Sequence, residues 1–371
     1  MRTFIFLPPL PRASGGLAVL HQIAGHLQQA GLPVWLVPRE GVGKNFAPEN
    51  FQPENSASSN NLTNNPSTNL PVPFWPFEEL ELTPKDIWLV PEGWPNALAP
   101  GLEAKCRNVV YVQNWAYLLS ALPEGVRWPQ LPVHFLAVSQ PVAAFIRLVT
   151  GKNAPVLRPG LDLNLFCPSA DQGNQLVLQG KKPQRLNIGY MPRKNKAVAE
   201  QARQIIEARQ STGCPLHWLP IDGKSASEVA ATLKSCHIYM GTGFPEGFGL
   251  PPLEAMACGA LPVSCAGFGA FDYLRQALPD LPAMAPLPAF APPNFANSTL
   301  PNLPNAFIVP DADPLGLALA VEAAAKWIIE GNENLPQLLA NGQTTARACS
   351  LNVQARECAR LWAAAQQDEI F

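Results

Sequence analysis

The sequence predicts an α/β protein built from two parallel-sheet domains joined end to end, and three observations support this class. A strand-like run at 3–7, apolar residues at helical spacing over 17–27 and a strand-like run at 33–37 form a β-α-β unit. A second alternating series of strands and helices begins at residue 186. The 371 residues also exceed the roughly 250–300 that one hydrophobic core usually serves.

Short apolar runs and helix signals give the remaining elements in chain order. In the first half we expect strands at 87–90, 109–112 and 135–138 and a helix at 141–149. In the second half we expect strands at 186–190, 216–221, 238–242 and 261–265, separated by helices at 197–209, after 221 and at 251–258. The helix after 221 begins with a capping box of Ser225 and Glu228. Helices at about 314–330 and 335–367 end the chain, with a break in the second as the alternative to one continuous helix.

Two segments rich in Pro interrupt this pattern. Asn, Pro and Ser dominate 44–76, and Pro recurs through 279–305, so both are expected to be insertions without regular structure. The first domain is expected to span 1–165 with the mobile insertion 44–76, completed by the C-terminal helix 352–371. The second is expected to span 183–345 with the insertion 279–305.

Composition excludes several classes of protein. The chain has 41 Pro, yet 47% of its residues are hydrophobic and nine are Trp, unlike a disordered chain. The net charge of −2 gives no field that would gather nucleic acid. No run of about 18 apolar residues is present to span a membrane. The eight Cys form no CxxC pair, which favours free thiols in the cytoplasm and no zinc site.

Three known ligand-binding motifs are not supported by the sequence. Gly223-Lys224-Ser225 lacks the Gly that a P-loop needs five residues earlier, where Trp218 stands. The first β-α turn has no G-x-G-x-x-G dinucleotide fingerprint, which argues against an NAD-dependent oxidoreductase. Asp311-Ala312-Asp313 resembles a metal-binding DxD, but Asp313 followed by Pro314 is typical of a helix cap, so no metal is assigned.

The segment 241–267 carries the expected chemistry. Pro251 and Pro252 can open a helix, so the preceding loop offers backbone N–H groups to an anion such as phosphate. Glu246 lies in that loop, and Glu254 is expected in the first helical turn. A carboxylate can accept two hydrogen bonds from vicinal sugar hydroxyls. The alternatives are a solvated loop charge for Glu246 and a carboxylate favoured by the helix dipole for Glu254.

The run EGFGLPPLEAMACG at 246–259 resembles the donor-site signature of retaining GT-B glycosyltransferases of the GT4 type. Further segments are similar to that family in order along nearly the whole chain: Ser14-Gly15-Gly16, VVYVQN, FLAVSQ, LRPGLDLNLFCP and NAFIVPDADPLGLALAV. The resemblance implies the GT-B fold, with two Rossmann-like domains facing across a cleft. It also implies a nucleotide-diphosphate sugar donor, retention of configuration, and neither metal nor other cofactor.

The resemblance assigns roles to individual residues. It implies that Glu246 contacts the transferred sugar and Glu254 the ribose. Backbone groups of Phe248, Gly249 and Leu250 would contact the donor. By the same resemblance, Gly15 and Gly16 would approach the phosphates or the acceptor.

A leaving diphosphate needs cations where no metal serves. The family places them after the first strand of the second domain, where this chain has Arg193 and Lys194, with Lys196 behind them. Tyr190 stands where the family often has Arg, so the choice of cation stays open. Near the site of a family His this chain has Gln113 and Asn114, the acceptor-side candidates.

The sequence therefore predicts a cytoplasmic, metal-independent hexosyltransferase-like enzyme of glycan, glycolipid or polysaccharide biosynthesis. The catalytic candidates are Glu246, Arg193 and Lys194. Its partners would be a nucleotide-diphosphate sugar and a glycan or lipid-linked acceptor, with peripheral membrane contact allowed and no nucleic acid. The alternative is a catalytically silent relative that binds nucleotide sugar or serves as a scaffold.

Overall fold

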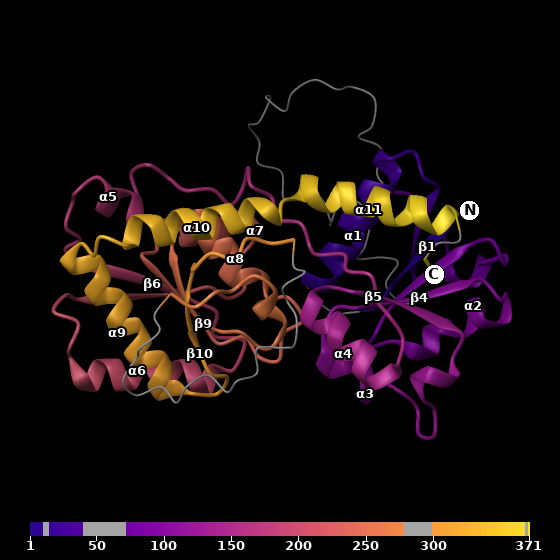
Figure 1. Cartoon of the computed structure of the whole chain (residues 1–371), viewed down its shortest axis with the longest axis horizontal. Helices are drawn as coiled ribbons and strands as arrows, with labels where there is room; N and C mark the ends of the chain where they lie inside the picture. The colour runs from indigo at the N-terminus through magenta and orange to yellow at the C-terminus, as the bar shows by residue number, and fades with distance from the viewer. Residues whose placement is uncertain (10–14, 40–71, 278–298, 368–369) are drawn as a thin grey trace. The chain divides into compact units, whose positions relative to one another are not determined.

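The computed structural model describes residues 1–9, 15–39, 72–277, 299–367 and 370–371 (Figure 1). The chain forms two compact units. Unit 1 comprises Met1–Val138, Ala143–Gly160 and Asn352–Phe371, and unit 2 comprises Ser139–Val142 and Leu161–Leu351. Most of the insertions expected at 44–76 and 279–305, as well as Ser14, lie outside the described residues.

Unit 1 is built on a five-stranded parallel sheet of order β2-β1-β3-β4-β5. Buried apolar and aromatic residues fill the strands, as expected for a sheet covered on both faces. The strands are β1 Thr3–Leu7, β2 Val34–Pro38, β3 Ile87–Pro91, β4 Arg107–Val112 and β5 Val133–Ala137. The helices are α1 Gly15–Gln29, α2 Ala99–Glu103, α3 Trp115–Ser120, α4 Gln140–Thr150 and α11 Leu351–Gln366, with 3-10 turns η2 Phe77–Glu79, η3 Pro95–Leu98 and η4 Trp128–Gln130.

The last helix belongs to unit 1 although it is distant in sequence. α11 runs beside α1 in Figure 1, and His26 of α1 is hydrogen-bonded to Gln354 of α11 at 3.1 Å. The indole Nε1 of Trp362 donates to Thr3 Oγ1 at the start of β1, at 2.8 Å. The long helix expected at 335–367 is broken at Cys349 and Ser350, between α10 and α11.

The loop expected through residue 76 extends too far. Phe74 pairs in parallel with Leu36 of β2. Trp75 then packs edge-on against Phe4 and Trp35, with ring centroids 5.6 and 5.7 Å apart. These ring contacts attach residues 74 and 75 to the edge of the first sheet, which composition alone does not reveal.

Unit 2 repeats the architecture of unit 1 with the order β10-β9-β8-β6-β7, again all parallel. Counted within each unit, both sheets have the order 2-1-3-4-5 of doubly wound α/β folds. The strands are β6 Leu186–Tyr190, β7 Leu216–Pro220, β8 Ile238–Gly241, β9 Leu261–Cys265 and β10 Phe307–Val309. The helices are α5 Asn174–Leu178, α6 Lys196–Arg209, α7 Ala226–Ser235, α8 Leu250–Cys258, α9 Pro314–Glu330 and α10 Leu335–Ala348, with the 3-10 turn η5 Gly269–Asp272.

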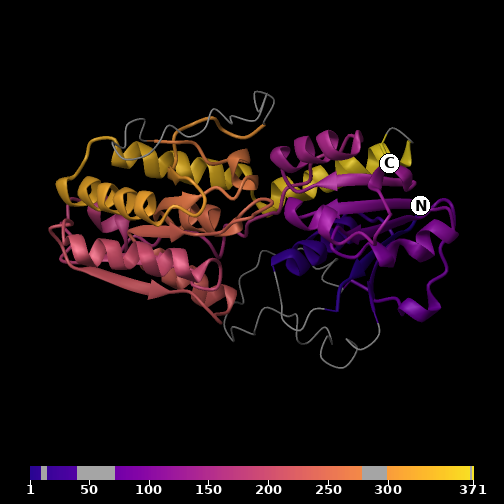
Figure 2. The ribbon, with the colours of Figure 1, turned by 90° about the horizontal axis from the view of Figure 1, so that it is seen from below.

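Helices cover both faces of the second sheet. α7, α8 and α10 lie on one face and α6 and α9 on the other (Figure 1). In Figure 2 the strands of each unit again lie between layers of helix. The two Rossmann-like domains predicted from the sequence are therefore confirmed, and the capping box of Ser225 and Glu228 opens α7 as expected. No described helix is long and apolar enough to span a bilayer.

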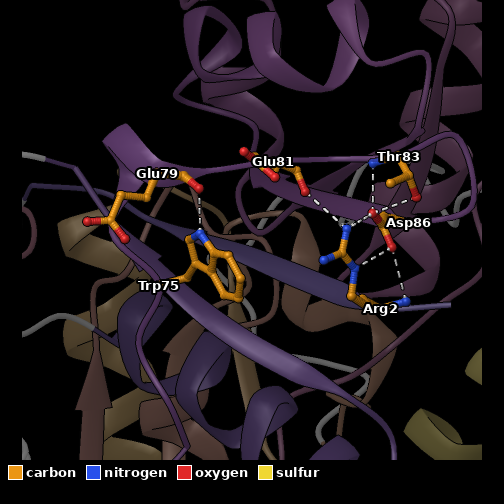
Figure 3. A network of polar contacts seen from close by, with 6 residues as sticks. All are labelled: Arg2, Trp75, Glu79, Glu81, Thr83 and Asp86. Carbon is orange, nitrogen blue, oxygen red and sulfur yellow. Dashed lines mark hydrogen bonds and ion pairs between the residues drawn. The ribbon is translucent and has the colours of Figure 1, made fainter.

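An ion pair between Arg2 and Asp86 joins the segments that directly precede β1 and β3 (Figure 3). Arg2 donates from Nε and Nη2 to the carboxylate of Asp86, at 3.0 and 2.6 Å. Thr83 donates to Asp86 from its backbone N–H and its hydroxyl, at 2.7 and 2.8 Å. Asp86 is buried, and these hydrogen bonds lower the pKa of its carboxyl against the opposing effect of burial.

We expect Asp86→Ala to lower the free energy of unfolding by about 2–3 kcal/mol, because it leaves the partly buried guanidinium of Arg2 unpaired. Denaturant unfolding measures the change. Glu81→Ala is the matched control, since Glu81 contacts Arg2 through its backbone carbonyl and its side chain is exposed. A loss as large in the control as in Asp86→Ala would contradict this account.

Candidate functional site

The candidate site lies at the carboxyl ends of β6 and β8, where the strand order of the second sheet reverses. In doubly wound folds such a reversal opens a crevice that binds ligands. The segment after β6 brings Lys194, and the segment after β8 brings Glu246, to one pocket. The other lining residues come from the ends of β6, β8 and β9 and the start of α8: Met191, Tyr239, Gly241, Thr242, Gly243, Gly249, Pro251, Pro252, Ser264, Cys265, Ala266 and Ala270.

Backbone hydrogen bonds fix Glu246 against the segment that follows β9. Its N–H donates to the Gly267 carbonyl at 2.8 Å, and its own carbonyl accepts from the Gly269 N–H at 3.0 Å. Both glycines are required by close packing. A Cβ at Gly269 would lie 2.0 Å from the Gly247 carbonyl oxygen, and Gly267 has φ +55 with the Gly243 oxygen 2.6 Å from where its Cβ would be.

Side-chain hydrogen bonds join the loops after β6 and β8. Asn195 Nδ2 donates to the carbonyls of Thr242 and Phe244, at 2.7 and 2.8 Å. Thr242 Oγ1 donates to the Lys194 carbonyl at 2.7 Å. Within this frame the Lys194 ammonium pairs with the Glu246 carboxylate, whose side chain is 15% exposed. The two charges that the sequence assigned to catalysis are therefore in direct contact.

The loop before α8 is held through its carbonyl groups. The carbonyl of Gly247 accepts from Ser139 Oγ at 2.6 Å, and that of Gly249 accepts from the Tyr273 hydroxyl. By contrast, no described residue accepts a hydrogen bond from the N–H groups of Gly247, Phe248 or Gly249, although all three residues are buried. These N–H groups lie at the start of α8, where the first N–H groups of a helix have no partner within it, so the loop can offer them to an acceptor of hydrogen bonds.

Glu254 lies one residue further along α8 than expected. The helix begins at Leu250, ahead of the two prolines, which places Glu254 in its second turn and removes the simple dipole explanation. The residue as a whole is partly exposed, yet burial of its carboxyl raises the pKa to about 7. No described residue forms a hydrogen bond or ion pair with this carboxylate.

The other two cations predicted for the donor site do not line the pocket. Arg193 is exposed and forms no hydrogen bond or ion pair with a described residue. Lys196 opens α6 and lies 3.5 Å from Glu200 on the exposed surface of that helix. Sequence proximity did not separate these residues from Lys194, because a turn of the chain points neighbouring side chains in different directions.

The DxD-like segment has two structural roles. Asp313 caps α9 by accepting from the Gly316 N–H at 2.8 Å, as the sequence indicated. Asp311 accepts from the Gly267 N–H at 3.0 Å and so supports the segment that holds Glu246. In the part of the chain that the structure describes, no group of three His, Cys, Asp or Glu residues could hold a metal ion.

The candidates of unit 1 gather at the carboxyl ends of its own strands. Gly15 and Gly16 open α1, and a Cβ at Gly16 would lie 2.7 Å from Gln113 Oε1. Asn114 caps α3 by accepting from the Ala116 N–H at 3.1 Å. Glu92, which the sequence did not mark as a candidate, is a buried carboxylate that accepts hydrogen bonds from the N–H groups of Gln113 and Asn114. Its position directly after a strand-like run is the signal that could have identified it.

Several solved structures resemble this one over nearly their whole length at low sequence identity. Sucrose-phosphate synthase from Thermosynechococcus elongatus has a TM-score of 0.57 and 14% identity, with 98% of each chain covered. HepE from Anabaena in complex with UDP-glucose has a TM-score of 0.61 and 13% identity, covering 98% of this chain and 100% of that one. The catalytic domain of starch synthase IV from Arabidopsis thaliana, bound to ADP and acarbose, has a TM-score of 0.56 and 12% identity, covering 98% of this chain and 99% of that one.

Sequence comparison adds no family to this likeness. No family model matches the chain, and no curated protein matches it in sequence. The structural likeness shows that this chain has the two-domain fold of those enzymes. The site residues carry the functional argument.

We expect Glu254→Gln to stabilise the unliganded protein at pH 8 by on the order of 1–3 kcal/mol. The raised pKa of Glu254 means that the folded state binds the proton more tightly than the unfolded state. Its contribution to stability is therefore present below the ordinary pKa of a glutamic acid and is lost as pH rises through about 7. Unfolding free energies measured from pH 5 to 8 test this.

The control for this substitution is Glu330→Gln, because the Glu330 side chain is 62% exposed. It should leave the pH dependence of stability unchanged. A pH dependence in Glu254→Gln equal to that of the parent protein would contradict the assigned environment.

Proposed function

We propose that this protein is a retaining glycosyltransferase that moves a sugar from a nucleotide-diphosphate sugar to a hydroxyl group of a glycan or lipid-linked acceptor. The main observation in support is that the backbone N–H groups of Gly247, Phe248 and Gly249 form no hydrogen bond with a described residue. They lie beside the ion pair of Lys194 and Glu246. Fold likeness to enzymes solved with UDP-glucose and with ADP supports the same class of donor.

The donor can be assigned to these groups by charge. Backbone N–H groups at a helix N-terminus favour the diphosphate, and Lys194 adds a full positive charge. The partnerless carboxylate of Glu254 suits the paired hydroxyls of the ribose. Glu246 would orient the transferred sugar. Because Lys194 and the N–H groups compensate the charge, the proposal needs neither metal nor other cofactor.

The proposed reaction occurs on one face of the donor sugar. The bond between the anomeric carbon and the diphosphate oxygen breaks, and a bond from that carbon to the acceptor oxygen forms on the same side. The acceptor hydroxyl gives its proton to the leaving phosphate oxygen. Lys194 stabilises the negative charge that grows on the diphosphate.

The ion pair with Glu246 gives Lys194 a second state. A bound diphosphate competes with the Glu246 carboxylate for the ammonium group, so donor binding would release Glu246 to meet the sugar hydroxyls. This competition favours Lys194 over Arg193 as the cation of the site, since only Lys194 lines the pocket.

Donor identity can be read from a binding panel. We expect one class among UDP-, GDP- and dTDP-sugars to raise the melting temperature, since a ligand that binds only the folded state stabilises it by mass action. Turnover of that donor with an added acceptor distinguishes an enzyme from a silent nucleotide-sugar-binding relative. Absence of stabilisation by every nucleotide sugar would refute the donor proposal. Pelleting with lipid vesicles tests the allowed peripheral membrane contact separately.

Two substitutions should affect different steps. Glu246→Gln should lower transfer by at least about 100-fold, because the carboxylate would orient the transferred sugar. It should not weaken nucleoside diphosphate binding, because loss of the carboxylate leaves Lys194 available to the diphosphate. Lys194→Ala should weaken nucleoside diphosphate binding by about 10- to 100-fold through loss of a charge-assisted contact. Calorimetry and initial-rate kinetics measure the two effects.

Matched lysine and arginine variants complete this test. Lys326→Ala removes an exposed lysine of α9 and should change neither quantity. Arg193→Ala should have a smaller effect on diphosphate binding than Lys194→Ala. The reverse order would transfer the role to Arg193.

A further inference from the structure

Glu92 occupies the position in unit 1 that corresponds to the ligand-binding crevice of a doubly wound sheet. It directly follows β3, and the strand order of the first sheet reverses between β1 and β3. The residue is 5% exposed. No part of the donor chemistry proposed above uses it.

The carboxylate of Glu92 accepts hydrogen bonds from two successive backbone N–H groups. Its Oε2 accepts from the Gln113 N–H at 3.0 Å, and its Oε1 accepts from the Asn114 N–H at 2.8 Å. No described cation pairs with it, and burial raises its pKa to about 7. A buried carboxylate without a cation is unfavourable for folding. The two hydrogen bonds to the Gln113–Asn114 turn are therefore the contacts that set this carboxylate apart.

Those N–H groups belong to the turn that joins β4 to α3. Asn114 caps α3, which uses its side chain. Gln113 differs, because its side-chain amide forms no hydrogen bond with a described residue, and its Oε1 lies beside Gly16 at the start of α1. A Cβ at position 16 would displace this amide from its place. The turn thus presents a free carboxamide between two helix N-termini.

We propose that Glu92 is a positioning residue for acceptor binding: its carboxylate fixes the Gln113–Asn114 turn so that the Gln113 carboxamide can bind a hydroxyl group of the acceptor. This role rests on the proposed glycosyl transfer. A carboxamide has a donor and an acceptor and so suits a sugar hydroxyl, which also has both. Both oxygens of Glu92 are needed, because one fixes each N–H group of the turn.

Glu92→Gln in the full chain tests the proposal. The variant keeps the shape of the side chain but replaces one accepting oxygen by an NH2 group, which cannot accept a hydrogen bond. We expect hydrogen–deuterium exchange of the 113–116 backbone to become about tenfold faster, and the KM for the acceptor to rise about tenfold, as for loss of one charge-assisted hydrogen bond. The Kd of the donor should not change, because its binding groups belong to unit 2.

Coupling to Gln113 separates positioning from a general structural role. The acceptor KM of Glu92→Gln/Gln113→Ala should equal that of Gln113→Ala alone, because Glu92 acts through Gln113. Glu103→Gln, an exposed carboxylate at the end of α2, is the control and should change neither exchange nor KM.

Two results would overturn the assignment. One is unchanged exchange at 113–116 in Glu92→Gln, and the other is a KM effect that adds to that of Gln113→Ala. Failure of the proposed function has a different signature, since the parent protein would then bind no nucleotide sugar. Hydrogen–deuterium exchange at 113–116 shows whether Glu92 fixes the turn, whether or not the protein binds a nucleotide sugar.

Discussion

Reversal of strand order between β6 and β8 is the constraint on which the candidate site depends. Parallel strands deliver their following loops to one edge of the sheet, and the reversal sends the adjoining helices to opposite faces. The loops after β6 and β8 are thereby left side by side without a helix between them. Hydrogen bonds from Asn195 and Thr242 then join these loops, which is how Lys194 and Glu246 come into contact.

Each unit contains a carboxyl group whose burial in the ionised form is unfavourable for folding. Glu254 and Glu92 each carry a carboxyl whose pKa burial raises to about 7, and neither has a described cation as partner. Glu92 accepts two backbone hydrogen bonds, whereas Glu254 accepts none from described residues. The difference suits their proposed roles. Glu92 accepts hydrogen bonds from backbone N–H groups of the protein, whereas the carboxylate of Glu254 is proposed to accept them from the ribose of the donor.

The two units share a topology but use it differently. In unit 2 the reversal point brings together opposite charges and open backbone N–H groups, which suits an anionic donor. In unit 1 the equivalent point carries a neutral carboxamide and a helix N-terminus, held by a carboxylate that faces inward. A neutral polar surface suits a ligand that carries hydroxyl groups, which agrees with the place proposed for the acceptor.

Sequence patterns alone predict the fold class, most of the strands and the segment proposed to bind the donor. Periodicity locates β6 and β9 to the residue, because burial of a strand between two helical layers requires a continuous apolar run. Prolines and glycines located α8, since their backbone restrictions act locally.

Which of these residues lie together follows from the three-dimensional fold. Arg193, Lys194 and Lys196 are nearly equivalent in sequence, and only the turn after β6 selects Lys194 for the pocket. Order at 72–76 depends on Phe4 and Trp35, and the role of Glu92 depends on a turn 21 residues away in the chain. Such contacts join residues that are distant in sequence, so a local sequence pattern does not show that these residues lie close together in the fold.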